Sequence, residues 1–263
     1  MKNIKIIAMD FDGTLLTSDK KITERTKKCL TYLKQSHTII GITARNLLSV
    51  KNVLDVSLFD YIILNNGSDI YYVKKDKTEN ISYINNEITK ELYNLYKNEA
   101  SRIDFCTSKN YLCITKERND NRPFIKYIEG LDEINDNVSR MNIFLKNEEE
   151  VEAKKKKIEE LFHDINVVKM LDTDKENSKI WLSINPKNIS KLTTLKKIST
   201  KLNYSLNDVV FFGDGENDLL LIENAGIGIA MGNAIESVKE KATYITLSND
   251  EDGIAEYLEK NID

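Results

Sequence analysis

Two aspartates that are one residue apart follow the first apolar run of the sequence. Asp10 and Asp12 come directly after Ile4-Lys5-Ile6-Ile7-Ala8-Met9, and Gly13 follows them. A short, isoleucine-rich run is typical of a buried strand, and a glycine allows a sharp turn where the strand ends. Residues 10 and 12 of a strand project to the same side, and two carboxylates about 4 Å apart repel each other by about 4 kcal/mol at an effective dielectric constant of about 20. Such a pair needs a cation or a shared proton, so this position is the first candidate for chemistry.

Further polar residues follow later apolar runs. Thr43 and Asp214 each follow a run rich in isoleucine, valine or phenylalanine, and Asn217 and Asp218 open the helix expected after Asp214. Functional groups collect at the carboxyl ends of the strands in a doubly wound sheet, so these side chains are expected to converge with the first aspartate pair. Four carboxylates and one hydroxyl fit a hard divalent cation, and Mg²⁺ most naturally.

Other metal sites and catalytic triads fit the sequence poorly. A calcium-binding EF-hand loop that began at Asp10 would need glutamate at position 21, which is Lys21, and one that began at Asp214 would need glycine at position 219, which is Leu219. The two histidines, His37 and His163, lie in no ligand-like spacing, which argues against a zinc site or a Ser-His triad.

Lys191 lies in the first turn of a helix predicted over residues 190–202. The positive end of the helix dipole disfavours a cation there by about 0.3–1 kcal/mol, and a bound anion nearby would reverse that sign. On this argument alone, a solvated surface lysine is the simpler interpretation.

The order of the apolar patterns predicts the fold that must position these residues. Strand-like and helical patterns alternate at both ends of the chain, which is the signature of a parallel sheet with crossover helices. The expected strands of this part lie at residues 4–9, 38–42, 61–64, 209–212, 227–231 and 244–246. The fold class is therefore α/β, with a doubly wound, Rossmann-like core formed by residues 1–78 and 186–263.

The middle of the chain follows a different pattern. Short strands are expected at residues 70–73 and 81–84, on either side of a charged turn at 74–80, and helices are expected at 87–99 and 148–163. Antiparallel strand patterns lie between and after these helices. Residues 79–185 are therefore predicted to form an inserted α+β module.

Composition limits the partners and the compartment. The chain has a net charge of −4, with 41% hydrophobic and 30% charged residues, and this weak negative charge argues against nucleic acid or an anionic membrane as the main partner. No apolar run approaches the roughly 20 residues of a membrane span, and none suits a signal peptide. Three cysteines fit free thiols, and a disulfide between Cys106 and Cys113 is disfavoured. A cytoplasmic monomer or small homo-oligomer is expected.

The candidate residues resemble the four ordered motifs of the haloacid dehalogenase (HAD) superfamily of phosphatases. The matching residues are Asp10-Phe11-Asp12-Gly13-Thr14-Leu15, then Thr43, then Lys191, then Gly213-Asp214 with Asn217-Asp218. The insertion between the second and third motifs, with Met231-Gly232-Asn233-Ala234 downstream, is similar to the Cof-type branch with a type IIB cap. The resemblance implies that residues 79–185 are a cap that selects the substrate.

The resemblance also implies a role for each motif residue. Asp10 would be the nucleophile that becomes an aspartyl-phosphate, and also a Mg²⁺ ligand. Asp12 would be the general acid and base, with its backbone carbonyl on the metal, and Asp214 would complete the metal site. The phosphoryl oxygens would be held by Thr43, Ala44, Lys191 and Asn217. Asp218 is a further candidate at the metal site, where it would orient Lys191 or the metal's waters; a helix-start cap is its structural alternative.

The second motif departs from the family pattern. The family commonly has Thr-Gly-Arg, whereas this chain has Thr43-Ala44-Arg45. If the family glycine uses a positive φ, alanine there is strained. Arg45 is expected either to contact substrate or to cap the sheet edge.

The resulting functional hypothesis is a Mg²⁺-dependent phosphatase that acts on small phosphorylated metabolites, sugar phosphates or similar. A phosphotransferase or phosphomutase shares the aspartyl-phosphate and is the first alternative, and a non-catalytic phosphometabolite-binding protein is the second. The intact pair Asp10 and Asp12 argues against the second. The sequence does not say which basic residues of the module face a substrate, and the candidates are Arg118, Arg122, Lys126 and Arg140.

Overall fold

A computed structural model describes residues 4–118, 120–145, 150–172 and 179–262 of the chain. The chain divides into two compact units. The core unit comprises residues 1–45, 50–77 and 190–263, and the inserted unit comprises residues 46–49 and 78–189. Each unit is described below by itself.

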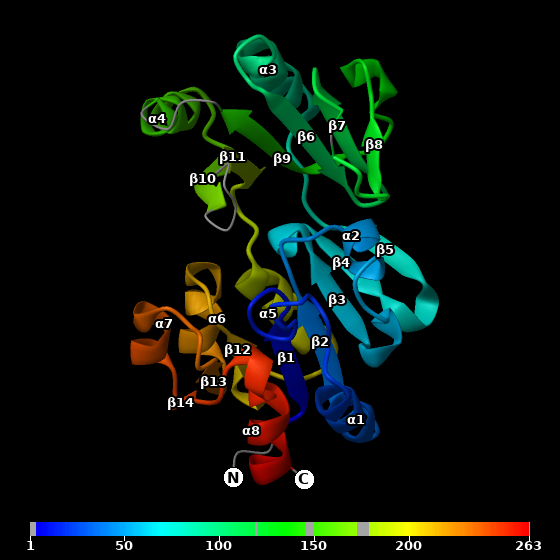
Figure 1. The fold of residues 1–263 in the computed structure, drawn as a ribbon, viewed down its shortest axis with the longest axis vertical. Coiled ribbons are helices and arrows are strands. Elements are labelled where there is room, and N and C mark those ends of the chain that lie inside the picture. Colours follow the sequence, from blue (N-terminus) through cyan, green and yellow to red (C-terminus); the bar gives the residue numbers. More distant parts are fainter. Residues whose placement is uncertain (1–3, 119, 146–149, 173–178, 263) are drawn as a thin grey trace. The chain divides into compact units, whose positions relative to one another are not determined.

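The core unit is built on an eight-stranded sheet with the strand order β14-β13-β12-β1-β2-β3-β4-β5 (Figure 1). Its first six strands in that order pair in parallel, β4 is antiparallel to β3, and β5 lies at the edge. The strands are β1 (Ile6–Asp10), β2 (Thr38–Ile42), β3 (Tyr61–Leu64), β4 (Asp69–Tyr72), β5 (Lys77–Asn80), β12 (Val209–Gly213), β13 (Ile227–Ala230) and β14 (Tyr244–Ile245). In the centre, Ala8 of β1 lies opposite Phe211 of β12 and Ile40 of β2.

Helices cover both faces of this sheet. They are α1 (Glu24–Leu33), α5 (Lys191–Lys201), α6 (Leu219–Asn224), α7 (Glu236–Lys241) and α8 (Gly253–Asn261). The short helix α2 (Leu47–Lys51) begins in the inserted unit and ends in the core unit. Helix α1 packs with α8, and α5 packs with α6. The crossovers β1-α1-β2 and β12-α6-β13 run in opposite directions along the sheet, so right-handed connections place α1 and α6 on opposite faces. All residues of β1 and β12 are buried, which is why both strands have continuous apolar sequences. The predicted doubly wound α/β fold is confirmed.

Single 3₁₀ turns occur in both units, and Leu131–Glu133 is the one in the inserted unit among the described residues. They are Val56–Leu58, Asn65–Gly67, Val73–Lys75, Leu131–Glu133, Leu206–Asp208, Glu216–Asp218 and Asn249–Glu251. Two of them, Asn65–Gly67 and Glu216–Asp218, follow the ends of β3 and β12 closely, so they lie at the edge of the sheet where the motif residues also lie.

The inserted unit holds a six-stranded sheet with the order β10-β11-β9-β6-β7-β8, in which only the β7–β8 pair is parallel. Its elements are α3 (Asn86–Tyr96), β6 (Arg102–Thr107), β7 (Tyr111–Thr115), β8 (Ile125–Tyr127), β9 (Val138–Leu145), α4 (Val151–Leu161), β10 (Ile165–Asp172) and β11 (Lys179–Pro186). Its core joins strand residues such as Phe105 and Ile143 to Leu92 of α3 and Ile158 of α4. Because side chains alternate along a strand, Asp104 of β6 projects to the opposite face of the sheet from Phe105. The unit is α+β, as predicted; its role as a specificity cap stays a prediction.

Some local predictions are wrong. Residues 81–83 form no strand, and Ile84 makes only an isolated bridge to Val138, whereas β5 falls inside the expected charged turn. The chain reverses at Asp76, which has φ 43°, and returns as an edge strand, where polar side chains are tolerated. The expected helix over 148–163 begins at Val151 instead, with residues 148–149 outside the described part of the chain.

Two expectations about the whole chain can also be compared with the structure. All three cysteines are free and buried, which agrees with the absence of a predicted disulfide. Among the described helices, none combines the length and the apolar character that crossing a membrane requires.

Candidate active site

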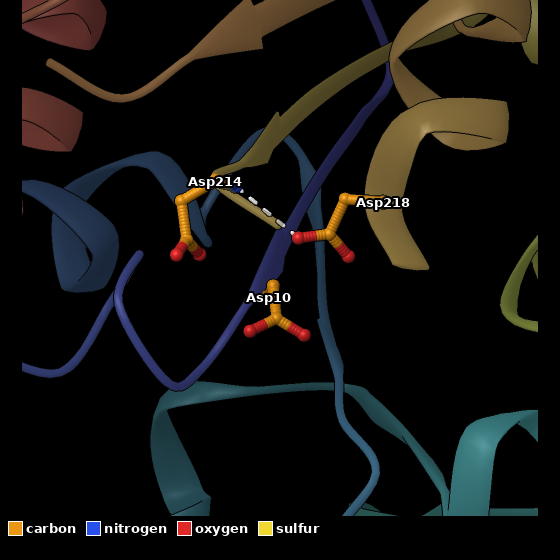
Figure 2. A group of neighbouring side chains, drawn as sticks. All are labelled: Asp10, Asp214 and Asp218. Atoms are coloured by element: carbon orange, nitrogen blue, oxygen red, sulfur yellow. Dashed lines mark hydrogen bonds between the residues drawn. The ribbon is translucent and has the colours of Figure 1, made fainter. Parts of the chain in front are cut away.

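Three carboxylates converge at the carboxyl end of the central strands. Asp10 ends β1, Asp214 follows β12, and Asp218 lies in the 3₁₀ turn Glu216–Asp218. Because β1 and β12 are adjacent and parallel, their ends lie side by side. Each aspartate offers an oxygen within 4.8 Å of the other two, and Figure 2 shows the three side chains around a common space. Asp10 and Asp218 are buried and Asp214 is half-buried.

Lys191 supplies the positive charge of this group. It is the first residue of α5, whose N-cap Ser190 accepts a hydrogen bond from the backbone N–H of Thr193. The Lys191 Nζ lies 2.5 Å from Asp10 Oδ1 and 2.7 Å from Asp218 Oδ1. Burial lowers the pKa of Lys191, but its attraction to the two carboxylates outweighs that effect and raises the pKa above its usual range. With 4% exposure, Lys191 is not a solvated surface lysine.

Asp218 performs two of the tasks expected of it. Its Oδ1 accepts from Lys191, and its Oδ2 accepts from the backbone N–H groups of Asp214 at 3.2 Å and Gly215 at 3.3 Å (dashed line to Asp214 in Figure 2). It therefore orients the lysine and also caps the start of the turn. Its two oxygens thus accept from the lysine and from the start of the turn, and its place at the metal stays a prediction.

Burial raises the pKa values of the other two members. Burial raises the pKa of Asp10 well above its ordinary range, and the neighbouring Lys191 opposes this only in part. Burial also raises the pKa of Asp214 to about 6, although its Oδ1 accepts a hydrogen bond from Thr14 Oγ1 at 2.6 Å. Three carboxyl groups thus lie together, two of them paired with Lys191, and their oxygens are the donors that a hard divalent cation prefers.

Asp12 lies outside this acidic group, so the expectation of four clustered carboxylates is wrong for its side chain. Strand β1 ends at Asp10, and the chain then turns at Gly13, which has φ 81°. A Cβ at Gly13 would lie 2.2 Å from Asp214 Oδ2, so glycine is required by space as well as by conformation. The alternation of strand side chains therefore does not extend to position 12.

Arg45 holds the Asp12 carboxylate instead. Arg45 Nε donates to Asp12 Oδ2 and Arg45 Nη2 donates to Asp12 Oδ1, both at 2.7 Å, and Lys20 Nζ lies 3.2 Å from Oδ1. Burial raises the pKa of Asp12. The hydrogen bonds and charges of Arg45 and Lys20 lower the pKa by more than burial raises it, so the net shift is downward. Sequence reasoning considered a substrate or the sheet edge as the partner of Arg45 and missed this pair. The usable signal was the position of both residues at carboxyl ends of adjacent strands.

The rest of the second motif is ordered by its backbone. Thr43 is buried, its N–H donates to Ile63 O at 2.9 Å, and its Oγ1 accepts from the Arg45 N–H at 3.1 Å. Ala44 is half-buried and does not have a positive φ. The strain considered for alanine at this position is therefore absent.

The remaining candidates take different places. Asn217 is exposed in the turn Glu216–Asp218 of the core unit. In the inserted unit, Arg118 pairs with Glu129, Arg122 pairs with Asp120, Lys126 is exposed, and the buried Arg140 lies 3.3 Å from Cys106 Sγ through Nη2. Arg118 and Arg122 are thus engaged in ion pairs within the unit.

Comparison with known proteins agrees with the motif resemblance. The profile of the haloacid dehalogenase-like hydrolase family matches residues 7–258. The 5-amino-6-(5-phospho-D-ribitylamino)uracil phosphatases YcsE and YitU of Bacillus subtilis are each 28% identical over 97% of this chain, covering 95% and 96% of those proteins. A haloacid dehalogenase-like hydrolase from Bacteroides thetaiotaomicron has a TM-score of 0.83 and 28% identity, with 98% of this chain and 99% of that chain covered.

The subclass IIB sugar phosphatase BT4131 shares the fold, with a TM-score of 0.78, 22% identity, and coverage of 97% of this chain and 98% of that one. The family match spans nearly the whole sequence and includes all four motifs. This chain therefore belongs to the haloacid dehalogenase-like hydrolase family, and it is a phosphatase.

Proposed function

We propose that the protein is a Mg²⁺-dependent phosphatase that hydrolyses small phosphorylated metabolites through an aspartyl-phosphate on Asp10. The observation that carries the proposal is the position of Lys191 Nζ between Asp10 and Asp218, beside Asp214. A buried nucleophile next to a fixed ammonium group and excess carboxylate oxygens suits an anionic phosphoryl group that arrives together with a cation.

In the first half of the reaction, a carboxylate oxygen of Asp10 attacks phosphorus and forms the acyl-phosphate bond as the bond to the leaving oxygen breaks. We assign the protonation of that leaving oxygen to Asp12, whose carboxylate must first take up a proton, because Arg45 and Lys20 hold its pKa low. In the second half, Asp12 takes a proton from water, the water oxygen attacks phosphorus, and the Asp10 carboxylate and inorganic phosphate are regenerated. A carboxylate nucleophile in this way divides one difficult hydrolysis into two easier steps.

The phosphoryl oxygens need donors during both steps. Lys191 brings the charge, because its pKa is raised by its neighbours and it stays protonated. The Thr43 hydroxyl, the Ala44 backbone N–H and the Asn217 amide are the further donors that we assign to these oxygens. Donors fixed in advance around the equatorial oxygens stabilise the charge that develops there.

Mg²⁺ fits the donor set of this site. Asp10 and Asp214 would hold it through carboxylate oxygens, Asp12 through its backbone carbonyl, and Asp218 would orient the ion's waters. The gathering of oxygens of Asp10, Asp214 and Asp218 within 4.8 Å of one another is the observation that supports a cation here. When bound, Mg²⁺ offsets the repulsion between the nucleophile and the phosphate.

The substrate class follows from the family and from the relatives named above. We assign residues 79–185 to a cap that contacts the leaving group, and small sugar and sugar-alcohol phosphates are the substrates that we propose. The two Bacillus subtilis relatives are named for a phosphorylated ribityl compound, which places that compound on the test panel.

The test is release of inorganic phosphate from a metabolite panel, with Mg²⁺ and after removal of divalent ions by EDTA. Steady release that stops on chelation and returns with Mg²⁺ supports the proposal. Full activity after chelation, with metal absence confirmed by elemental analysis, contradicts the metal dependence. Phosphoryl transfer to a second sugar without phosphate release would identify a phosphomutase or phosphotransferase instead.

A further inference from the structure

The turn that follows β3 has an unusual backbone. Asn65, Asn66 and Gly67 have φ values of 48°, 56° and 111°, so three consecutive residues lie in the region that L residues rarely adopt. Asparagine and glycine tolerate this conformation best. Such strained segments persist only where surrounding contacts determine them, and they gather at functional sites.

One side of the turn is bonded to the second motif. The Asn65 N–H donates to Arg45 O at 3.0 Å, and the Asn66 N–H donates to Thr43 O at 3.2 Å. The two carbonyls belong to the two ends of the segment Thr43-Ala44-Arg45. The left-handed turn thereby fixes the loop that carries the proposed phosphate donors.

The other side of the turn is bonded to the helix that carries Lys191. Thr194 Oγ1 donates to Gly67 O at 2.7 Å, and the Thr194 side chain is fully buried. A Cβ at Gly67 would lie 2.4 Å from Ser190 O, so the turn contacts the N-cap of α5 directly. Lys191 is the next residue after that N-cap.

We propose that the turn Asn65–Gly67 is a positioning element that sets the Lys191 end of α5 against the Thr43-Ala44-Arg45 loop, with the Thr194 hydroxyl as its bond to the helix. The proposal rests on the phosphatase function described above. The phosphoryl group must be held at the same time by Lys191 and by the loop, which come from segments far apart in the sequence. Small displacements between such groups are costly, since catalysis depends on their mutual geometry. Thr194 touches none of the reacting groups and acts through Lys191.

The experiment compares two hydroxyls of the same helix. Thr194→Val keeps the side-chain shape and removes the bond to Gly67. Ser199→Ala is the matched control, because Ser199 is also buried in α5 and its Oγ donates to Leu195 O at 2.9 Å, within the helix. The affinity for orthovanadate in the presence of Mg²⁺, measured by calorimetry, reports the phosphoryl site without requiring turnover.

We expect Thr194→Val to bind orthovanadate about five- to tenfold more weakly than the wild type, as the loss of one positioning hydrogen bond implies. Ser199→Ala should keep the wild-type affinity, and Thr194→Ser, which keeps the hydroxyl, should restore it. Thr194→Ala replaces the valine variant if that variant does not fold.

Equal affinity in Thr194→Val and the wild type would overturn the positioning role. An equal loss in Ser199→Ala would overturn it as well, because it would show a general loosening of α5. Phosphate release by the wild type tests the proposed function separately: a protein that binds orthovanadate but releases no phosphate refutes the phosphatase and leaves the positioning result standing. A wild type that binds no orthovanadate refutes both.

Discussion

In the core unit, the side chains of Asp10, Asp214 and Asp218 lie together, and the ammonium group of Lys191 pairs with Asp10 and Asp218. In the inserted unit, Asp104 and Asp120 are paired with two guanidinium groups. Arg102 Nε lies 2.6 Å from Asp104 Oδ1, Arg102 Nη1 lies 2.7 Å from Asp120 Oδ2, and Arg122 Nη2 lies 2.5 Å from the same oxygen. Both groups contain buried charged side chains, and they differ in the number of carboxylates relative to the number of cationic groups.

The core group has more carboxylates than cations, whereas the group in the inserted unit has two of each, with Arg102 Nη2 buried and without a hydrogen-bond partner among the described residues. Desolvated carboxylates in excess of their cations repel one another, so a bound cation would stabilise the core group. In the inserted unit, the second oxygen of Asp104 accepts from the Tyr111 hydroxyl at 2.6 Å, so each oxygen of this fully buried carboxylate has a donor. A balanced and hydrogen-bonded network of this kind contributes to a unique fold.

The largest expected effect is that of Asp10→Asn. Asparagine keeps the volume but cannot form the acyl phosphate, so turnover should fall by at least about 10⁴-fold. The fold should survive, since Lys191 keeps Asp218 as its partner. Phosphate release and circular dichroism of the purified variant check both statements. Steady-state turnover above contaminant level would show that Asp10 is not the nucleophile. The acidic group of the core unit would then no longer be the functional member of the two groups compared.

Arg45→Lys sharpens the account of the core unit. Lysine cannot reproduce the two-point contact with Asp12, so kcat should fall about 10- to 100-fold with sugar phosphates. The loss should be smaller with an activated aryl phosphate, because a good leaving group needs little protonation. Arg25→Lys is the control, since Arg25 also bonds carboxylates, Glu256 and Glu259, but between α1 and α8. An equal loss on both substrates would indicate a lost phosphate contact rather than a misplaced Asp12.

Asp104→Asn tests the inserted unit. It removes a fully buried charge from Arg102, which should lower the free energy of unfolding of that unit by about 3 kcal/mol. Trp181 in β11, the only tryptophan of the sequence, stacks on Phe144 and reports this unit by fluorescence during urea unfolding. Asp136→Asn, which breaks the exposed pair with Lys109, should cost less than about 1 kcal/mol.

Turnover of a small aryl phosphate should change little in folded Asp104→Asn. A variant of normal stability that had lost activity would show that the balanced network is functional, and the contrast between the two units would then fail.

The two units also differ in how far their sequences predict them. The parallel strands β1, β2, β3 and β12 follow from continuous apolar runs, because each is buried on both faces. The acidic group follows from the rule that the ends of such strands meet at one edge. The pair between Arg45 and Asp12 does not follow, since it depends on the turn at Gly13, after strand alternation has ended.

At the edge of the core sheet, the misplacement of β5 has a similar cause. Its sequence Lys-Thr-Glu-Asn has no apolar period, and an edge strand is held by backbone pairing to β4 rather than by side-chain burial. In the inserted unit, the partners of basic residues such as Arg118 and Arg122 are also set by tertiary packing. The apolar pattern of a sequence indicates which residues of one helix or strand are buried. The ion pairs and the pairing of an edge strand depend instead on contacts between elements.

The smallest expected effect is that of Ala44→Gly, which restores the common family residue in the second motif. Because Ala44 does not have a positive φ, glycine relieves no strain there, and turnover should change by less than about twofold. The added freedom of the unfolded chain should lower the melting temperature by about 1–3 °C. Gly13→Ala is the contrasting variant, because φ 81° and the 2.2 Å approach of a Cβ to Asp214 Oδ2 should remove most activity. A rise in kcat/KM of about fivefold or more for Ala44→Gly would contradict this expectation. Such a rise equals about 1 kcal/mol of transition-state stabilisation and would mean that the Ala44 methyl group restricts the phosphate contacts.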